Sequence, residues 1–526
     1  MALAKNIYKE LESVVGAHNI SENIGVLQAY SKQPFPPGLL GRKRPDAIVL
    51  PESVYDVQAV VKLANRYKLA YIPTGNYNWD VPQQDNTVII DFKKMNKIIE
   101  IDERNLYAVV EPGVTHAQLQ AECMKRGLVC NSTWGGSPCS VLANTIFFGV
   151  GGLSYRFGFN RVLLCMEWVL PTGEIMKTGS LATDGAGYFW PGGPGPDLRG
   201  LIRGFFGVSG GFGVVTRIGV KLMPWPGPAT FPVSGVAPNF KIRFPSDRFR
   251  FHLIRYPSLD ELIDAMYAFG EAEIGAVLQR FPSAWFQWGT ARSKEEFWKG
   301  WETGYFQKAA ENVIAVWLVG FSSTRQLDYE EKVLQHIIKK TGGEDIPPRD
   351  RLYKTVDPAL VGDWFLCGNS GRIMRPAGTH MIAMVALDSI DHSAKVANRA
   401  DEIRKDFDFM DSDKDDWVCT YDFGWQGDAE CLILPEQTED CMRKAMELAI
   451  AGLKASLQDK TYTVLQISDT HPVLGPVYGN YHELLKKIKK ALDPANLANP
   501  PNPIQVDETE DCEKSLNSRR EEDNGI

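Results

Sequence analysis

The stretch PDAIVLPESVYDVQAVVKLANRYKLAYIPTGN, residues 45–76, indicates a strand, a turn, a helix and a second strand. Ser53 suits a helix N-cap, because a hydroxyl there can accept a hydrogen bond from a free backbone N–H. Apolar residues from Val57 to Ala64 then recur at helical spacing, and Leu69 to Ile72 are rich in strand formers. This stretch therefore predicts a βαβ unit.

Further short segments of the same half are rich in Val, Ile and Tyr and are bounded by polar turns. They predict strands at 87–92, 97–102 and 106–113. Residues 117–127 favour a helix that Gly127 closes, and 162–179 favour a hairpin around Pro171-Thr172-Gly173. Up to about residue 224 we expect a glycine-rich α+β domain.

Beyond the Pro- and Gly-rich stretch 224–235 the pattern changes. Amphipathic segments at 258–273 and 328–343 alternate with apolar strands at 312–321 and 379–388. This alternation predicts a second α+β domain, a sheet with helices packed on one side. A helix is expected within 481–503, ending at Asp493-Pro494, followed by a polar tail.

Composition narrows the class of protein. The 526 residues are 44% hydrophobic and carry a net charge of −8, which argues against disorder and against binding to nucleic acid. The nine cysteines are scattered, so we expect neither a disulfide framework nor a thiolate metal site. We find no export signal and no apolar run near the ~18 residues of a membrane span. We expect a cytoplasmic protein, in which Asn131-Ser132-Thr133 is a chance glycosylation match.

Most familiar catalytic signatures are missing. No Gly-Lys dipeptide occurs, which excludes the phosphate-binding P-loop, and no glycine cluster follows the dinucleotide pattern G-x-G-x-x-G between a strand and a helix. Residues 207–211 match the hydrolase motif G-x-S-x-G, but a strand follows the Ser where that motif requires a helix. We interpret this segment as a glycine turn.

Three clusters combine glycine or proline with small hydroxyl and amide residues, at 73–78, 111–114 and 135–152. Loops of this kind allow backbone N–H groups to approach an anion without obstruction by Cβ. Several in one domain favour a long pyrophosphate ligand, although each one taken alone is equally typical of a tight turn.

In their order along the chain, the motifs of 45–76, 88–115, SVLANT (140–145), MEWVLPTGEIMKTG (166–179) and FGVVTRIGVKLMPWPGP (212–228) resemble the FAD-binding domain of the vanillyl-alcohol oxidase/p-cresol methylhydroxylase family. ALDPANLANP (491–500) is similar to that family's closing segment. The resemblance implies a PCMH-type FAD-binding domain at 1–228 (core 40–225), and a cap domain of antiparallel sheet plus helices at 229–468. It further implies a segment at 469–505 that returns to the first domain, before a polar tail at 506–526.

The resemblance implies FAD as the cofactor and assigns residues to it. The diphosphate would be held by the first and third clusters, while the second cluster and the start of a late strand would lie along the cofactor. These residues are Pro73, Thr74, Gly75, Asn76, Tyr77, Asn78, Pro112, Gly113, Val114, Gly136, Ser137, Ser140, Asn144, Gly149, Gly213, Val214 and Val215. His380 stands where some members attach the flavin covalently; the alternative is an unlinked His beside the ring.

Two departures argue against vanillyl-alcohol chemistry in detail. Phe147 stands where phenol-oxidising members place an acid, and their Tyr-Arg pair is not evident in 461–475. We expect His471 to accept a substrate proton with Asp469 orienting its ring, or else to cap local backbone. Tyr421, Gln426, Asp428, Arg372 and Arg375 are further pocket candidates; the arginines would suit a carboxylate, or they are surface charges.

The segment 281–306 is rich in aromatic residues. It is typical of a substrate pocket, a subunit contact or ordinary core. For the chain as a whole we expect an FAD-linked oxidase or dehydrogenase acting on the CH-OH group of an alcohol or a phenolic/aromatic small molecule. Its electron acceptor would be oxygen or a redox partner protein, and we expect a homo-oligomer. The alternatives are a D-2-hydroxy-acid dehydrogenase and a flavin-binding protein without turnover.

Overall fold

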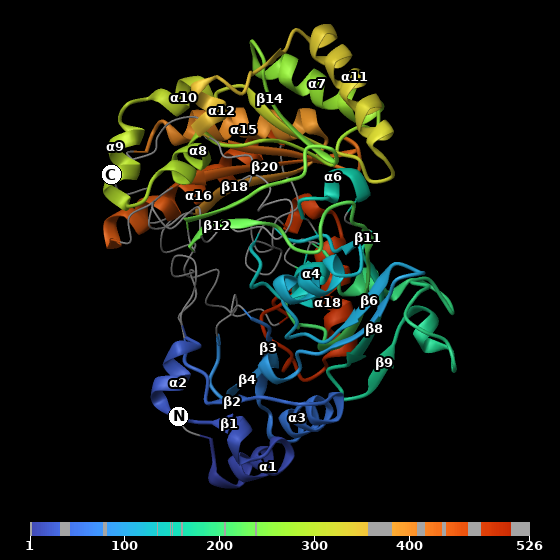
Figure 1. Ribbon diagram of the computed structural model, residues 1–526. Helices are drawn as coiled ribbons and strands as arrows, with labels where there is room; N and C mark the ends of the chain where they lie inside the picture. Colours follow the sequence, from blue (N-terminus) through green and yellow to red (C-terminus); the bar gives the residue numbers. More distant parts are fainter. Residues whose placement is uncertain are drawn as a thin grey trace, which may run out of the picture.

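The structure of the protein is a computed structural model. It describes residues 3–31, 43–76, 82–133, 135–147, 149, 151–158, 161–204, 207–236, 239–355, 381–407, 416–433, 438–460 and 475–506. Figure 1 shows two domains, with the N-terminal elements at the bottom and the sheet that contains β14 and β20 at the top. The prediction of an α+β chain with two domains is confirmed.

The stretch that opens the sequence forms strand β2 (Ala47–Val49), helix α3 (Val54–Tyr67) and strand β3 (Ala70–Thr74). Ser53 caps α3 as predicted, because its side chain accepts from the N–H of Asp56 and the Asp56 side chain accepts in return. Both strands run parallel to β4 (Thr87–Asp91), which lies between them. The four-stranded sheet has the order β1-β2-β4-β3.

A five-stranded antiparallel sheet in the order β5-β6-β10-β8-β9 completes the first domain. The hairpin of β8 and β9 turns at Gly173, whose φ of +92° favours glycine. The remaining elements of this domain are α1 (Lys5–Val15), β1 (Ile20–Ser21), α2 (Ile24–Ala29), β5 (Ile98–Asp102), β6 (Tyr107–Val110), α4 (His116–Met124), β7 (Leu128–Val129), α5 (Val141–Phe147), α6 (Ser154–Phe157), β8 (Leu163–Val169), β9 (Ile175–Lys177), β10 (Val214–Lys221) and β11 (Met223–Pro224).

The second domain is built on a seven-stranded, fully antiparallel sheet, here called the cap sheet, in the order β17-β14-β16-β15-β19-β20-β18. A separate hairpin, β12 and β13, precedes it. The elements are β12 (Val233–Val236), β13 (Asn239–Ile242), β14 (Phe249–Arg255), α7 (Leu259–Glu271), β15 (Val277–Arg280), α8 (Ser283–Thr290), α9 (Lys294–Trp301), α10 (Tyr305–Ala309), β16 (Val313–Val319), α11 (Thr324–Thr341), β17 (Glu344–Asp345), α12 (Arg351–Thr355), β18 (Met381–Asp388), α15 (Ile390–Arg404), β19 (Asp416–Tyr421), β20 (Gln426–Ile433) and α16 (Glu439–Asp459).

The strand register defines two faces of the cap sheet, because residues directly opposite each other on paired strands share a face. One row consists of Leu253, Ala315, Gln279, Cys419 and Asp428, and we call its face the inner face. Inner-face residues share a core cluster with Met124, Val129 and Leu153 of the first domain. The other row, the outer face, consists of Ile254, Ile314, Arg280, Val418 and Ala429.

Helices cover both faces of the cap sheet, so the expectation of helices on one side was wrong. Apolar residues of α7, α11 and α15 pack against the outer face. The predicted aromatic segment forms α8, α9 and α10, which pack on the inner face over β14, β15 and β16. Phe281 and Trp285 stack at 4.2 Å between ring centroids, and both are fully buried. Of the three interpretations of this segment, ordinary core describes these buried rings.

Helix α18 (Tyr481–Leu492) and the residues after it return to the first domain. Leu485, Ile488 and Leu492 pack against the core of the five-stranded sheet. The chain then extends the edge of β3, since the Tyr71 N–H donates to Leu497 O (2.9 Å) and the Asn499 N–H donates to Tyr71 O (2.8 Å). The first domain thus contains segments from both ends of the chain. Among the helices of the described residues, none is long and apolar enough to cross a membrane.

Candidate functional site

The three glycine clusters converge in the structure. The first follows β3, the second follows β6, and the third leads into α5. The Ser140 hydroxyl donates to Pro112 O (2.5 Å), and the Val141 N–H donates to Val114 O (2.9 Å). The side-chain amide of Asn76 donates to Gly113 O (3.3 Å). Hydrogen bonds therefore join all three clusters into one loop assembly, which we call the loop junction.

Glycine is needed at the loop junction for close approach. A Cβ on Gly113 would lie 2.4 Å from the carbonyl oxygen of Phe92, and one on Gly75 would lie 3.2 Å from the Cβ of Ser140. Gly75 lies between two neutral donors, Thr74 and Asn76, and residues 73–76, 112–114 and 135–144 contain no carboxylate. The carboxylate of the second cluster, Glu111, is occupied by the N–H of Lys97 (2.8 Å). Neutral N–H and O–H groups on tightly packed loops suit a diphosphate, so the loop junction fits the predicted cofactor.

Most of the predicted cofactor residues lie at this junction. Thr74, Pro112, Gly113, Val114, Gly136 and Ser140 are buried, whereas Pro73, Gly75, Asn76, Ser137 and Asn144 are partly exposed. Gly149 joins the junction through Asn144, whose carbonyl oxygen accepts from the Gly149 N–H at 2.7 Å. The cofactor role of each residue stays a prediction. Tyr77 and Asn78 lie outside the described residues.

Gly213, Val214 and Val215 lie at the start of β10. A Cβ on Gly213 would lie 2.3 Å from Val169 O, so this turn packs directly on the end of β8. Val214 and Val215 are buried in two different hydrophobic clusters. Contact of these valines with a cofactor would therefore involve their backbone.

Sequence reasoning missed Asn131, which it treated only as part of a chance glycosylation match. Asn131 is buried and its amide donates to Gly149 O (3.1 Å) and to the Ser154 hydroxyl (2.9 Å). Its side-chain oxygen accepts from the N–H of Leu153 (3.2 Å). Asn131 thus connects the loop junction to α6, and no local sequence pattern indicates such a role.

His116 was also missed. It begins α4, and its N–H donates to Cys139 O (3.0 Å) at the edge of the loop junction. Both ring nitrogens are buried, and neither has a partner among the described residues. Burial lowers the pKa of His116 to about 3. The ring is therefore neutral at physiological pH.

Only one of the predicted catalytic residues can be placed. Tyr421 ends β19 on the inner face of the cap sheet and is fully buried. Its hydroxyl donates to Asp428 Oδ2 (2.8 Å), and burial together with the charge of Asp428 raises the pKa of Tyr421 well above its ordinary value. Asp469, His471, Arg375 and Arg372 lie outside the described residues, and so does His380.

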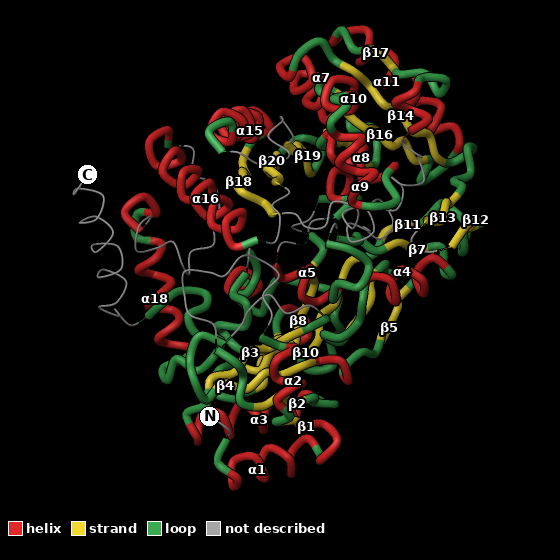
Figure 2. Tube along the Cα trace, turned by 90° about the vertical axis from the view of Figure 1, so that its left-hand side faces the viewer, coloured by secondary structure: helices red, strands yellow, loops and turns green. Residues whose placement is uncertain are grey.

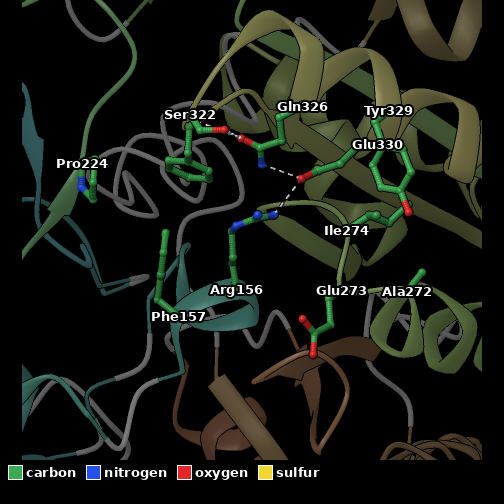
Figure 3. Close-up of a pocket in the computed structure, with 11 residues that line it drawn as sticks. Arg156, Phe157, Pro224, Ala272, Glu273, Ile274, Ser322, Gln326, Tyr329 and Glu330 are labelled. Atoms are coloured by element: carbon green, nitrogen blue, oxygen red, sulfur yellow. Dashed lines mark hydrogen bonds and ion pairs between the residues drawn. The ribbon is translucent and has the colours of Figure 1, made fainter.

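Figure 3 shows a pocket of about 470 Å³ where α6 of the first domain meets α7 and α11 of the second. Arg156 Nη1 lies 3.2 Å from Glu330 Oε1 and donates to Gly275 O (2.9 Å). Glu330 also accepts from the Gln326 amide (2.7 Å). The charges of Arg156 and Glu330 are paired with each other. None of the predicted site residues lines this pocket. We interpret it as a contact between the domains.

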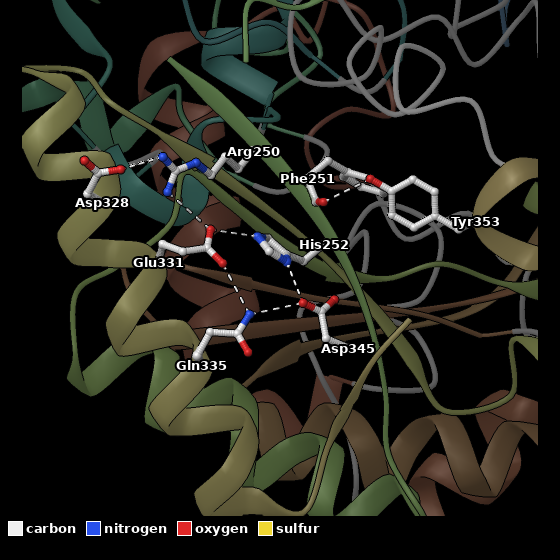
Figure 4. Close-up of polar contacts among 8 residues, drawn as sticks. All are labelled: Arg250, Phe251, His252, Asp328, Glu331, Gln335, Asp345 and Tyr353. Carbon is white, nitrogen blue, oxygen red and sulfur yellow. Dashed lines mark hydrogen bonds and ion pairs between the residues drawn. The ribbon is translucent and has the colours of Figure 1, made fainter. Parts of the chain in front are cut away.

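A second polar cluster surrounds His252 on the outer face (Figure 4). His252 Nδ1 lies 2.9 Å from Asp345 Oδ2, and Nε2 lies 3.1 Å from Glu331 Oε2. Burial lowers the pKa of His252, but hydrogen bonds to Asp345 and Glu331 outweigh it and raise the pKa to about 9. The imidazolium is held by α11 and β17, and both ring nitrogens are engaged. This cluster connects a helix and an edge strand to β14.

Similarity to known proteins points to the same loop junction. The family model described as FAD binding domain matches residues 45–179, which contain all three glycine clusters. The flavoprotein subunit of 4-cresol dehydrogenase [hydroxylating] from Pseudomonas putida is 32% identical over 231 residues, 41% of this chain and 42% of that protein. Glycolate oxidase subunit GlcD from Bacillus subtilis is 29% identical over 231 residues, 43% and 46% of the two chains. The matches span less than half of these relatives.

Solved structures extend the likeness to both domains. A 4-ethylphenol oxidase from Gulosibacter chungangensis has a TM-score of 0.76 at 20% identity, covering 96% of this chain and 98% of that one. p-Cresol methylhydroxylase has a TM-score of 0.75 at 19% identity, with coverage of 95% and 96%. Residues 45–179 are therefore an FAD binding domain, which indicates FAD as the cofactor, and the two domains together have the fold of p-cresol methylhydroxylase.

Proposed function

We propose that this chain is an FAD-dependent oxidoreductase that oxidises a CH-OH group in an alcohol or a phenolic/aromatic substrate. The observation that carries the proposal is the loop junction, where three glycine clusters of an FAD binding domain are hydrogen-bonded together. The cap sheet shares a core with the first domain, so its inner face lies on the same side as that domain. We retain the predicted domain boundaries, with the FAD-binding domain at 1–228, the cap domain at 229–468 and the returning segment at 469–505.

When bound, FAD supplies a two-electron acceptor. The substrate alcohol would lose a hydride from its carbon and a proton from its hydroxyl, which leaves a carbonyl product. Both electrons would then pass to oxygen or to a redox partner protein. The loop junction would orient the diphosphate through Thr74, Asn76 and Ser137, and the cap sheet would keep water from the reacting carbon.

The substrate proton needs an acceptor, and we assign it to His471, oriented by Asp469. Arg375 would place a polar end of the substrate. Tyr421 would contribute from the inner face, where its hydroxyl proton is already donated to Asp428. These assignments rest on the sequence, apart from the position of Tyr421.

The second candidate is a D-2-hydroxy-acid dehydrogenase, and it is favoured by the similarity to a glycolate oxidase subunit. Arg372 and Arg375 would then bind the substrate carboxylate in bidentate fashion. Flavin binding without turnover is the third and weakest alternative. In each case we expect a homo-oligomer.

A panel of aryl alcohols and 2-hydroxy acids tests the proposal. Each compound is offered to the purified yellow holoprotein, and peroxide production and dye reduction are both measured. Turnover of aryl alcohols supports the first candidate, and turnover restricted to hydroxy acids supports the second. A colourless protein that stays without FAD after its addition would refute both.

Acid precipitation tests the predicted tether. If His380 is bonded to the flavin, colour stays with the precipitate of the natural protein and leaves it in His380→Ala. Colour in the supernatant of the natural protein would exclude the covalent link and leave the rest of the proposal intact.

A further inference from the structure

Helix α6 belongs to the FAD binding domain, yet it packs into the cap domain (Figure 1). The family model includes it, since Ser154–Phe157 fall within residues 45–179. Its Tyr155 is nevertheless buried in the cluster that α7, α11 and α15 form with the outer face of the cap sheet. The helix lies at the end of that sheet where β15 begins and β19 ends. We call its contact with these strand ends and with α11 the α6 contact.

Hydrogen bonds attach α6 to two strands of the cap sheet. The Asp422 N–H, after β19, donates to Ser154 O (3.0 Å), and the Phe423 N–H donates to Tyr155 O (2.7 Å). The Tyr155 hydroxyl donates to Ile274 O (2.9 Å), just before β15. The rings of Tyr155 and Phe423 also meet edge to face, with 5.3 Å between their centroids. One turn of helix from the first domain thus holds both strand ends.

Arg156 supplies the charged part of the α6 contact. Its pair with Glu330 on α11 is closed by Gly275, whose carbonyl oxygen accepts from Arg156 and whose N–H donates to Glu330 Oε2 (3.0 Å). The guanidinium carbon lies 5.2 Å from the ring centroid of Phe321, within reach of a cation–π interaction. The side chains of Arg156 and Glu330 are 17% and 4% exposed, so their attraction is screened less than that of a surface pair.

The other end of α6 is fixed to the third glycine cluster. The Ser154 hydroxyl accepts from the Gly151 N–H (2.9 Å) and from the Asn131 amide (2.9 Å). The same amide donates to Gly149 O. A Cβ on Gly151 would lie 2.1 Å from Ser132 O, so these residues pack without clearance. Ser154 is therefore bonded to the loop junction through its hydroxyl and to the cap domain through its carbonyl oxygen.

The third glycine cluster itself lies where the two domains meet. It leads into α5, and in Figure 2 α5 lies between the cap strands β18 and β19 and the strands β8 and β10 of the first domain. Gly149 follows α5 and bonds back to it through the Asn144 carbonyl oxygen. A shift of the cap sheet would therefore reach this cluster directly, through α6.

The pocket in Figure 3 lies beside α6, and Phe157, Phe321 and Tyr329 are among the residues that line it. On this side of α6 the domains are separated by a space of about 470 Å³, so polar contacts join them in place of continuous packing. Hydrogen bonds to charged groups are stronger than those between neutral groups. The pair of Arg156 and Glu330 is therefore the main contact on the pocket side.

We propose that Arg156 and Glu330 are positioning residues for the cofactor. Their pair holds the cap sheet against α6 and, through Ser154, keeps the third glycine cluster in the arrangement that binds the FAD diphosphate. Neither side chain has to touch FAD. Because coupling between two sites is reciprocal, FAD at the loop junction strengthens the α6 contact by the same factor. The inference concerns the cofactor and holds for either candidate substrate.

Hydrogen exchange of the FAD-loaded full chain, followed by mass spectrometry, tests this coupling. The N–H groups of residues 151–154 are all hydrogen-bonded within the segment or to residues 131 and 132. In Arg156→Met we expect them to exchange about tenfold faster than in the natural protein, because the segment loses its fixed neighbour. The N–H groups of β2 and β4, in the other sheet of the first domain, should keep their natural rates.

Arg250→Met is the matched control. Arg250 also pairs with α11, through Asp328 (2.5 Å), but it lies on β14, so this pair is internal to the cap domain. The exchange of residues 151–154 should stay unchanged in this variant. Arg156→Lys tests the contact itself. One nitrogen of Arg156 serves both Glu330 and Gly275, so an ammonium can replace it and should restore most of the protection.

Flavin fluorescence gives a second readout, because it rises when the flavin leaves its site, whether the flavin is tethered or free. On heating, Arg156→Met should show this rise about 3 °C below the unfolding transition seen by circular dichroism. In the natural protein and in Arg250→Met the two transitions should coincide. A loss of general stability would lower both transitions together and would not separate them.

The outcomes separate this inference from the proposed function. Natural exchange rates at 151–154 in Arg156→Met would overturn the inference, and so would an equal acceleration throughout the first domain. Glu330→Gln, which keeps the size of the side chain, takes the place of Arg156→Met if that variant does not fold, and should accelerate exchange about fivefold. A yellow protein that shows these effects but oxidises neither alcohols nor hydroxy acids would support the inference while refuting the proposed function.

Discussion

The closing helix and the inner face of the cap sheet both bury polar groups, but they treat them in opposite ways. Lys489 on α18 is fully buried, and its ammonium donates to Asp493 Oδ2, Gly211 O and Ala498 O, each at 2.7 Å. Asp493 accepts in addition from the N–H groups of Leu497 and Ala498. On the inner face of the cap sheet, by contrast, Gln279 Nε2 and Asp428 Oδ1 have no partner among the described residues.

The comparison distinguishes polar groups whose hydrogen bonds hold the fold together from polar groups that keep a hydrogen-bonding atom free of partners in the described residues. All three donors of the Lys489 ammonium are used within the protein, so this network holds α18 to the residues around Gly211 and Ala498. On the inner face of the cap sheet, part of the hydrogen-bonding capacity of Gln279 and Asp428 is not used by the described residues. Buried polar groups that remain unsatisfied in a folded protein call for an explanation, and a bound ligand is one. The saturated clusters around Lys489 and His252 join segments of their own domains, whereas Gln279 and Asp428 lie on the face of the cap sheet that packs toward the first domain.

Breaking the saturated cluster of the first domain should give the largest effect. Lys489→Met leaves Asp493 as an uncompensated buried charge, which costs about 3–5 kcal/mol of unfolding free energy. Urea denaturation measures the loss. Lys490→Met, at an exposed position of the same helix, is the control and should change stability by about 0.5 kcal/mol or less. Similar losses in the two variants would show that the network is not what holds the C-terminal segment.

The next largest effect on the free energy of unfolding should come from His116, at acid pH. Its pKa in the folded protein, about 3, lies below the ordinary value of 6.5, so the unfolded chain binds a proton first as pH falls. The protein should therefore lose about 2 kcal/mol of stability from this group between pH 7 and pH 5. His116→Phe should remove that part of the pH dependence, and His18→Phe, at an exposed position, should keep it. An unchanged slope in His116→Phe would contradict a buried neutral ring.

The smallest effect on the free energy of unfolding should come from His252, at alkaline pH. Its pKa of about 9 lies above the ordinary 6.5, so the stability it contributes is complete below pH 6.5 and is lost as pH rises through 9. Because Glu331 and Asp345 are partly exposed, we expect about 1–2 kcal/mol. Thermal unfolding at pH 6 and pH 9.5 measures this loss, which should vanish in His252→Gln. The exposed His336 on α11 provides the control His336→Gln; an equal effect there would contradict the paired imidazolium.

Local patterns in the sequence predicted the βαβ unit, the following strands and the hairpin of the first domain, but not α2, α5 or α6. The capping box at Ser53 and the turn at Gly173 depend on residues within a few positions of each other, and both occur where predicted. The resemblance also identified the clusters that meet at the loop junction. Their hydrogen bonds, such as Ser140 to Pro112, join residues far apart in sequence, so no local pattern predicts them.

The cap sheet shows where such patterns are insufficient. In β20 the alternation of Asp428 and Glu430 with Ala429 and Cys431 is typical of a strand whose polar side faces water. Asp428 is nevertheless buried, because that side faces the first domain. The placement of α8 to α10 on the inner face likewise depends on tertiary packing. Sequence reasoning did single out Asp428 and Tyr421, but as pocket candidates without knowledge that they bond to each other.

The pairing of Tyr71 with residues 497–499 affects the order in which the chain folds during synthesis. The βαβ unit leaves the ribosome early, but one edge of β3 stays without its partner until almost the whole cap domain has been made. Closing a contact between such distant residues is entropically slow compared with forming a helix or hairpin. The first domain to be synthesised is thus completed last, and the cap domain has to fold while its neighbour is still open.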